Sequence, residues 1–295
     1  MPAPTRRRAL TVTLATAAAV IAAPAGVAAA SPAAVGRPSR PRPLRHAHAH
    51  NDYLHPRPLR DALAHGFTSV EADIFLVGGE LLVAHDPAGL DPGRTLAGLY
   101  LEPLRALVRA GHGSVHPHHR RPLQLLIDIK ADGVAAYREL DRQLTRYGSL
   151  FTRYHHGQVR PGAVTAVISG DRAARVPMEA QRTRLSFYDG RLDDLGTASP
   201  ASFIPLISAN WTQTFGWLGA GPFPRAERDR LRTLVSTAHR EGRRIRFWAT
   251  PDLPGPEREA VWSELLAAGV DHLNTDDLAG LERFLRARAG ASPTP

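Results

Sequence analysis

The stretch 68–75, TSVEADIF, decides the fold of this 295-residue chain. Its apolar and polar side chains alternate, and Glu71 and Asp73 are two residues apart, so both carboxylates project from one face of a β-strand. The stretch 123–130, LQLLIDIK, repeats the arrangement with Asp128 and Lys130. The two stretches predict parallel strands whose charged residues meet at one mouth of a barrel, with apolar residues facing outer helices.

Working outward, further apolar runs alternate with longer helix-type segments. The other expected strands are 44–50, 163–169, 184–188, 203–210, 243–250 and 271–276. The expected helices are 96–110, 133–147, 224–241, 257–268 and 278–288. This alternation predicts an α/β chain with a single (β/α)8 TIM-type barrel domain over residues 44–290, rather than an open doubly wound sheet.

The first residues differ in composition from the rest. Arg6, Arg7 and Arg8 precede an Ala-rich apolar run and then small residues, so 1–30 is expected to be a cleavable signal peptide. Its string TRRRAL fits both a twin-arginine and a general secretory signal. Residues 31–43 are rich in Pro, Ala and Arg and are expected to be flexible. The protein is therefore expected to be exported, either secreted or in the cell envelope, and it has no cysteine for a disulfide.

The formal net charge is +9, without a polybasic block, which favours an anionic substrate or surface over nucleic acid. The basic stretch 225–246 is expected to be the solvent face of a helix and its neighbours. Lys130 is the only lysine in the chain, so its position is expected to need an ammonium group.

Acidic residues at the predicted mouth indicate a metal site. Carboxylates aimed into one mouth repel each other unless a cation lies between them. Glu71, Asp73 and Asp128 offer hard oxygen ligands for one divalent cation, Mg²⁺ or Ca²⁺, and zinc fits less well without His or Cys ligands.

Two histidines lie at strand ends near these carboxylates. His50 ends the first strand, and His85 ends the run 81–84 that follows a Gly78-Gly79 turn. Such a pair can act as base and acid across a phosphorus centre, with the roles left open. His48 would share a strand face with His50 and is the alternative at that position.

These motifs together resemble one superfamily. They are HNDY (50–53), SVEAD (69–73), VAHD (83–86), LIDIK (126–130), FWAT (247–250) and GVDHLNTD (269–276). The set is similar to the glycerophosphodiester phosphodiesterase and phosphatidylinositol-specific phospholipase C superfamily, above all to its "altered inheritance of mitochondria" branch. The His-Arg-Gly and Pro-Glu-Asn segments usual in glycerophosphodiesterases are missing here, which leaves the substrate open.

The resemblance implies a role for each matching position. His50 and His85 would be catalytic, Lys130 would lie beside the phosphate, and Glu71, Asp73 and Asp128 would bind the metal. Contacts with substrate are expected from Asn51, Asp52, Trp248 and Asp276. Apart from the resemblance, Asn210-Trp211-Thr212 lies at the predicted barrel mouth, so either Asn210 or Trp211 is expected to contact substrate as well.

The chain is therefore predicted to be a metal-dependent phosphoric diester hydrolase. The substrate would be a small phosphodiester or a phospholipid, cleaved in some cases through a cyclic phosphate, with transient contact to a membrane surface. Two alternatives remain. The stretch His46-Ala47-His48-Ala49-His50 fits the His-x-His of barrel amidohydrolases, although the middle strands offer no further histidine ligands. The second alternative is an inactive barrel that serves as a binding protein.

Overall fold

The structure is a computed structural model that describes residues 41–117 and 119–291. The expected signal peptide, 1–30, and most of the segment 31–43 lie outside the described residues.

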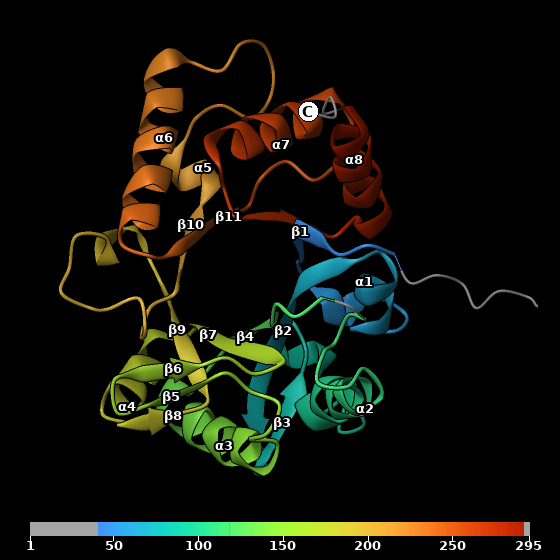
Figure 1. Ribbon diagram of the computed structural model, residues 1–295, viewed down its shortest axis with the longest axis vertical. Coiled ribbons are helices and arrows are strands. Elements are labelled where there is room, and N and C mark those ends of the chain that lie inside the picture. Colours follow the sequence, from blue (N-terminus) through green and yellow to red (C-terminus); the bar gives the residue numbers. More distant parts are fainter. Residues whose placement is uncertain (1–40, 118, 292–295) are drawn as a thin grey trace, which may run out of the picture. The chain divides into compact units, whose positions relative to one another are not determined.

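Eight parallel strands follow one another around a barrel, and the last pairs with the first (Figure 1). They are β1 (Leu44–Ala49), β2 (Phe67–Val77), β4 (Leu123–Ile129), β7 (Val164–Gly170), β9 (Ser186–Gly190), β10 (Leu206–Asn210), β11 (Arg244–Trp248) and β12 (His272–Thr275). The predicted closed barrel of eight parallel strands is confirmed, although β9 and β10 are joined by the short 3-10 helix Leu192–Asp194 rather than by an α-helix.

Helices cover the outer side of the strands. The long ones are α2 (Glu102–Ala110), α3 (Gly133–Arg146), α6 (Arg225–Arg240), α7 (Pro256–Ala268) and α8 (Leu278–Ala291), and the short ones are α1 (Arg60–Ala64), α4 (Arg175–Glu179) and α5 (Trp211–Thr214). Helix α3 packs on β2 and β4, α6 on β11 and α8 on β1. The five predicted helices are confirmed. Among the described helices, none combines the length and apolar character needed to cross a bilayer.

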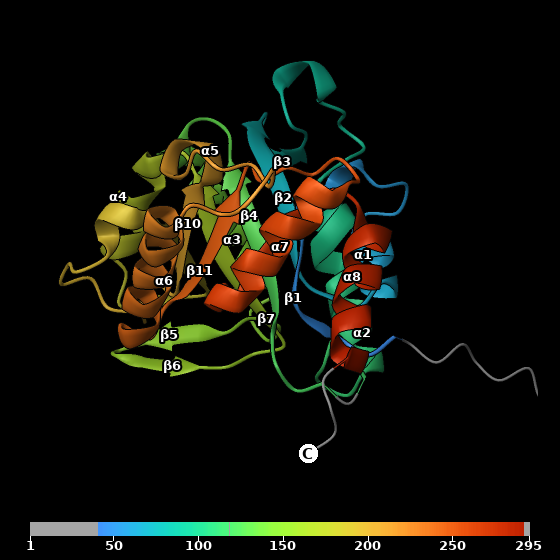
Figure 2. The same cartoon turned by 90° about the horizontal axis from the view of Figure 1, so that it is seen from above.

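Two additions to the barrel bear on the site. Strand β3 (Glu80–Val83) pairs antiparallel with β2 and carries the chain to His85. A small sheet of β5 (Arg153–His155), β6 (Gln158–Arg160) and β8 (Thr183–Arg184) was not predicted, because its strands are too short to show a periodic pattern. In Figure 2, β5 and β6 lie at one end of the barrel, and α5, which follows the carboxyl end of β10, lies at the other.

The strand residues divide into two environments. Side chains that face the helices form one large apolar core. Inside the barrel, Leu126, Val167 and Leu206 form a small buried apolar cluster. Most of the remaining interior is polar, because His48, Ser69, Glu71, Asp189, Ser208, Arg246 and Asn274 are all buried there. The inside of the barrel is thus built of hydrogen bonds and ion pairs as much as of apolar packing.

Candidate active site

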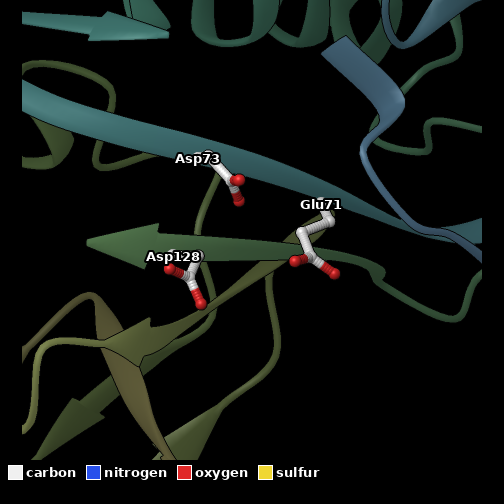
Figure 3. A group of neighbouring side chains, drawn as sticks. All are labelled: Glu71, Asp73 and Asp128. Carbon is white, nitrogen blue, oxygen red and sulfur yellow. The ribbon is translucent and has the colours of Figure 1, made fainter. Parts of the chain in front are cut away.

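Three carboxylates meet at the carboxyl ends of β2 and β4. In the parallel pairing Asp73 lies opposite Asp128, and Glu71 lies two residues earlier on the same face of β2. One oxygen of each of these three side chains lies within 4.8 Å of the others, and the side chains point into a common space (Figure 3). The convergence predicted from the alternation is confirmed.

The surroundings of these carboxylates leave negative charge uncompensated. Burial, and then the charge of Glu71, raises the pKa of Asp73 to about 6, with Lys130 acting in the opposite direction. Burial also raises the pKa of Asp128. In the part of the chain that the structure describes, Asp73 Oδ1 is buried without a hydrogen-bond partner. A cation held by the three carboxylates would satisfy this oxygen and offset the repulsion, so the donor set fits a divalent metal ion.

Lys130 faces inward beside these carboxylates, as the strand alternation predicts. Its Nζ lies 2.7 Å from Asp73 Oδ2 and 3.2 Å from Asp128 Oδ1. Burial alone would lower the pKa of Lys130, but the charges of Asp128 and Asp73 outweigh it, so the pKa is raised. The only lysine of the chain is therefore a fixed ammonium at the barrel mouth.

The two candidate histidines of β1 lie in different environments. His48 is fully buried, with Nδ1 2.7 Å from Ser69 Oγ and Nε2 3.0 Å from Glu71 Oε2. Burial lowers the pKa of His48 to about 4, so its ring stays neutral. His50 follows the strand and lies at the mouth, where 30% of its side chain is exposed. Of the two, only His50 is placed to reach a substrate.

His50 is held by Asp276, which follows β12. His50 Nδ1 lies 2.8 Å from Asp276 Oδ1, and the backbone N–H of Asp276 donates to Asp252 Oδ2 at 2.7 Å. Burial would lower the pKa of His50, but the hydrogen bond to Asp276 and the charge of Glu71 outweigh it and raise the pKa. Asp276, expected as a substrate contact, therefore touches the imidazole and orients it.

His85 lies beyond the end of β3, beside the same mouth. The N–H of Ala84 donates to the carbonyl of Asp73 at 3.3 Å, which fixes the chain just before His85. The imidazole is largely exposed, with Nδ1 3.9 Å from Asp86 Oδ2. No contact joins it to His50 among the described residues, so the expected opposition of the two rings across the carboxylates stays a prediction.

Two residues that were expected to contact substrate are buried, so that expectation is wrong for both. Asp52 is fully buried, and its Oδ2 accepts from the N–H of Leu59 at 2.6 Å and from the hydroxyl of Tyr100 at 2.9 Å. Asp52 therefore holds the loop after β1 and does not face the mouth. Trp211 is also fully buried, and its indole N–H donates to the carbonyl of Trp217 at 2.7 Å.

The other expected contacts lie at the mouth. Asn210 and Trp248 are register partners at the carboxyl ends of β10 and β11. Asn210 Oδ1 accepts from the N–H of Gln213 and so caps α5, whereas Trp248 is 36% exposed. Asn51 Nδ2 lies 2.9 Å from His50 Nδ1, and its Oδ1 lies 2.8 Å from the Tyr53 hydroxyl. Their contacts with substrate stay predictions.

Arg246 is a site residue that the sequence analysis missed. It is 3% exposed, inside the barrel, where Nη1 lies 3.0 Å from Glu71 Oε2 and donates to Asn274 Oδ1 at 3.0 Å. The prediction that 225–246 is solvent-facing is wrong at its end, since Arg243 is buried as well. The alternation in 244–248, RIRFW, puts Arg244 and Arg246 on the same face of a strand, and this pattern could have predicted that Arg246 points into the barrel.

Tyr53 is the second missed residue. It is 1% exposed, and its hydroxyl donates to Asp73 Oδ2 at 2.6 Å, so it completes the surroundings of that carboxylate. Its place in the HNDY motif (50–53) does not by itself predict this role.

Comparisons of the sequence with known proteins identify a family of similar chains. Residues 42–189 match the model of the AIM6-like phosphodiesterase domain, and residues 244–279 match that of the glycerophosphoryl diester phosphodiesterase family. The chain is 31% identical to altered inheritance of mitochondria protein 6 of Eremothecium gossypii, over 82% of this chain and 69% of that protein. It is 29% identical to the homolog of that protein from Arthroderma benhamiae, over 78% of this chain and 81% of that protein.

Proposed function

This chain belongs to the family of AIM6-like phosphodiesterases, and from that membership and the geometry of the barrel mouth we propose that it is a metal-dependent phosphoric diester hydrolase. The observation that carries the proposal is the convergence of Glu71, Asp73 and Asp128 beside a fixed ammonium. A phosphodiester is anionic, and its transition state places charge on the phosphoryl oxygens. A site with a lysine and a cation-binding donor set suits that charge.

Glu71, Asp73 and Asp128 would hold one divalent cation, and their oxygen-only donor set favours Mg²⁺ or Ca²⁺. When bound, such an ion neutralises charge on the phosphoryl oxygens. Lys130 would contribute its positive charge to the same oxygens. Asn51, Asn210 and Trp248 would line the remainder of the mouth and orient the substrate.

Proton transfer is assigned to His50 and His85. One imidazole takes the proton of the attacking hydroxyl as the new phosphorus–oxygen bond forms. The other gives a proton to the leaving alkoxide as the old phosphorus–oxygen bond breaks. The attacking hydroxyl belongs either to water or to the substrate itself, and in the latter case the first product is a cyclic phosphate. Asp276 keeps the His50 ring in position throughout.

The amidohydrolase alternative fits the structure less well. In that class the first strand supplies two histidines as metal ligands. Here both ring nitrogens of His48 lie within hydrogen-bond distance of protein groups, Ser69 Oγ at 2.7 Å and Glu71 Oε2 at 3.0 Å. His46 Nδ1 lies 3.1 Å from the carbonyl of Val270. These two histidines hold the strand in place, and the metal ligands proposed here are the carboxylate oxygens of Glu71, Asp73 and Asp128 instead of histidine nitrogens.

Export and lipid contact are further parts of the proposal. The three arginines and apolar run of residues 1–30 support export to the cell envelope or the medium. The substrate class is a glycerophosphodiester or a phospholipid, which in the second case requires transient contact with a membrane surface.

Hydrolysis of bis(p-nitrophenyl) phosphate by the purified chain, with and without chelator, tests the proposed function. We expect turnover that chelator abolishes and that added Mg²⁺ or Ca²⁺ restores. A panel of phosphodiesters followed by phosphorus NMR then identifies the head group and any cyclic product. Turnover that is indifferent to chelator, or no turnover of any diester with either cation, would contradict the proposal.

A further inference from the structure

A pocket adjoins the carboxylates through the side chain of Tyr53. It has a volume of about 440 Å³, which is enough for a small organic group. Its lining combines apolar residues with the polar residues His55, His85, Asp86 and Arg94. Tyr53 belongs to both places, since its hydroxyl donates to Asp73 Oδ2 at 2.6 Å, and the residue is part of the pocket lining, where its carbonyl accepts from Arg94. A molecule bound at the carboxylates could therefore extend directly into this pocket.

The pocket carries a cation without a matching carboxylate. The guanidinium of Arg94 donates to the carbonyl of Tyr53, and it has no ion-pair partner within residues 41–117 and 119–291. The carboxylate in the pocket, Asp86, is largely exposed, and its Oδ1 accepts from the N–H of Gly89 at 3.1 Å. A partly buried arginine with free N–H groups is well suited to a carboxylate or phosphate.

A second group in the same pocket lacks a partner. His55 Nε2 is buried and makes no hydrogen bond to any described residue. Buried polar atoms are nearly always paired, and His55 is one of the residues that line the pocket, so a bound ligand is one source of the missing partner. Arg94 offers N–H donors to an oxyanion, and the imidazoles of His55 and His85 in the same lining donate as well when the ring nitrogen that faces the anion carries a proton.

We infer that this pocket binds a second anionic group of the substrate, carried by the alcohol that leaves the scissile phosphate. The inference rests on the proposed function, because it places the reacting phosphate at Glu71, Asp73 and Asp128. The two anions would be separated by the length of the Tyr53 side chain. Diesters whose leaving alcohol bears a phosphate or carboxylate should then be preferred over those with a neutral alcohol.

Two matched diesters test the inference. Glycerophosphoglycerol has a neutral leaving alcohol, and its derivative with a further phosphate on that glycerol differs only in the second anion. We expect the kcat/KM of the full chain to be at least about tenfold higher for the phosphorylated diester, as a charge-assisted hydrogen bond implies. Arg94→Gln should remove this preference and Arg94→Lys should keep part of it. Arg232→Gln, at an exposed position of α6, should keep all of it.

A binding measurement separates this inference from the proposed function. Glycerol 3-phosphate titrated into chelator-treated protein by calorimetry should bind at least about tenfold more weakly to Arg94→Gln than to the unaltered chain. If neither diester is hydrolysed, this titration alone decides the pocket, and the proposed function is judged separately by the hydrolysis of bis(p-nitrophenyl) phosphate and of the other diesters. Hydrolysis without preference, or binding indifferent to Arg94, overturns the inference. Should Arg94→Gln fail to fold by circular dichroism, the unaltered chain's preference and the Arg94→Lys variant decide instead.

Discussion

Arg246 Nη1 lies 3.0 Å from Glu71 Oε2 inside the barrel, and the two residues come from β11 and β2. Burial alone would raise the pKa of Glu71, but the charge of Arg246 and the hydrogen bond from His48 outweigh it and lower the pKa. Glu71 is therefore ionised although it is buried. One oxygen is engaged by Arg246 and His48, and the carboxylate remains oriented toward Asp73 and Asp128.

Arg246→Met should destabilise the fold strongly, because it leaves the Glu71 carboxylate buried without its cation. Breaking one partner of a buried pair costs about 3–5 kcal/mol. Denaturant unfolding of the metal-free protein measures the loss. The double variant Arg246→Met/Glu71→Gln should recover part of it, since the buried charge is then gone. Equal losses in the single and double variants would show that Arg246 acts through packing alone.

The pH dependence of stability follows from Asp73. Its folded-state pKa is about 6 against an ordinary 3.8, so between these values the folded state holds a proton that the unfolded state has released. The resulting stabilisation is full below the lower value and is lost as the pH rises through about 6, by up to about 3 kcal/mol. Unfolding of chelated protein should therefore show a decline toward neutral pH that Asp73→Asn lacks. Saturating Mg²⁺ should reduce the decline, and identical pH profiles for the variant and the unaltered chain would contradict the assignment.

His50→Ala and His85→Ala should each lower kcat by at least ~10²-fold, because each removes one proton-transfer group. His155→Ala is the matched control. His155 lies on β5 at the opposite end of the barrel from α5, as Figure 2 shows, and its substitution should leave turnover unchanged. Steady-state kinetics on a diester with a poor leaving group measures these effects. A loss at His155 as large as at His85 would remove His85 from the mechanism.

Asp276→Asn should shift the pH profile of kcat/KM toward lower pH. The hydrogen bond from His50 to the Asp276 carboxylate raises the pKa of His50, so removing the negative charge lowers that pKa. The shift has this direction whether His50 acts as acid or as base. Asp277→Asn is the control, because the Asp277 carboxylate pairs with Arg258 at 2.9 Å rather than with a histidine. If Asp276→Asn leaves the pH profile unchanged, the titrating group that sets the profile is not His50.

The strands of the barrel could be predicted from the sequence because their alternation is local. The same alternation placed Glu71, Asp73, Asp128 and Lys130 on inward faces, and the structure brings them together. These predictions needed only the two-residue repeat of a strand and the convergence of parallel strand ends.

The burial of Arg246 and Asp52 could not be predicted from the sequence, because it depends on partners far along the chain. Arg246 is charged and lies after a basic helix, so its sequence neighbours suggest an exposed position. Its burial follows from Glu71, Asn274 and Ser208, which reach it only once the barrel closes. The same holds for Asp52, because its carboxylate accepts a hydrogen bond from the hydroxyl of Tyr100, which lies in a later segment of the chain.

The most direct measurement of the central claim is an anomalous-difference map from crystals of the full chain soaked in Mn²⁺. We expect a single strong peak within coordinating distance of Glu71, Asp73 and Asp128, and its loss in Asp128→Asn crystals treated in the same way. A peak elsewhere, or no peak at these carboxylates in a chain that turns over a diester, would contradict the proposed metal site.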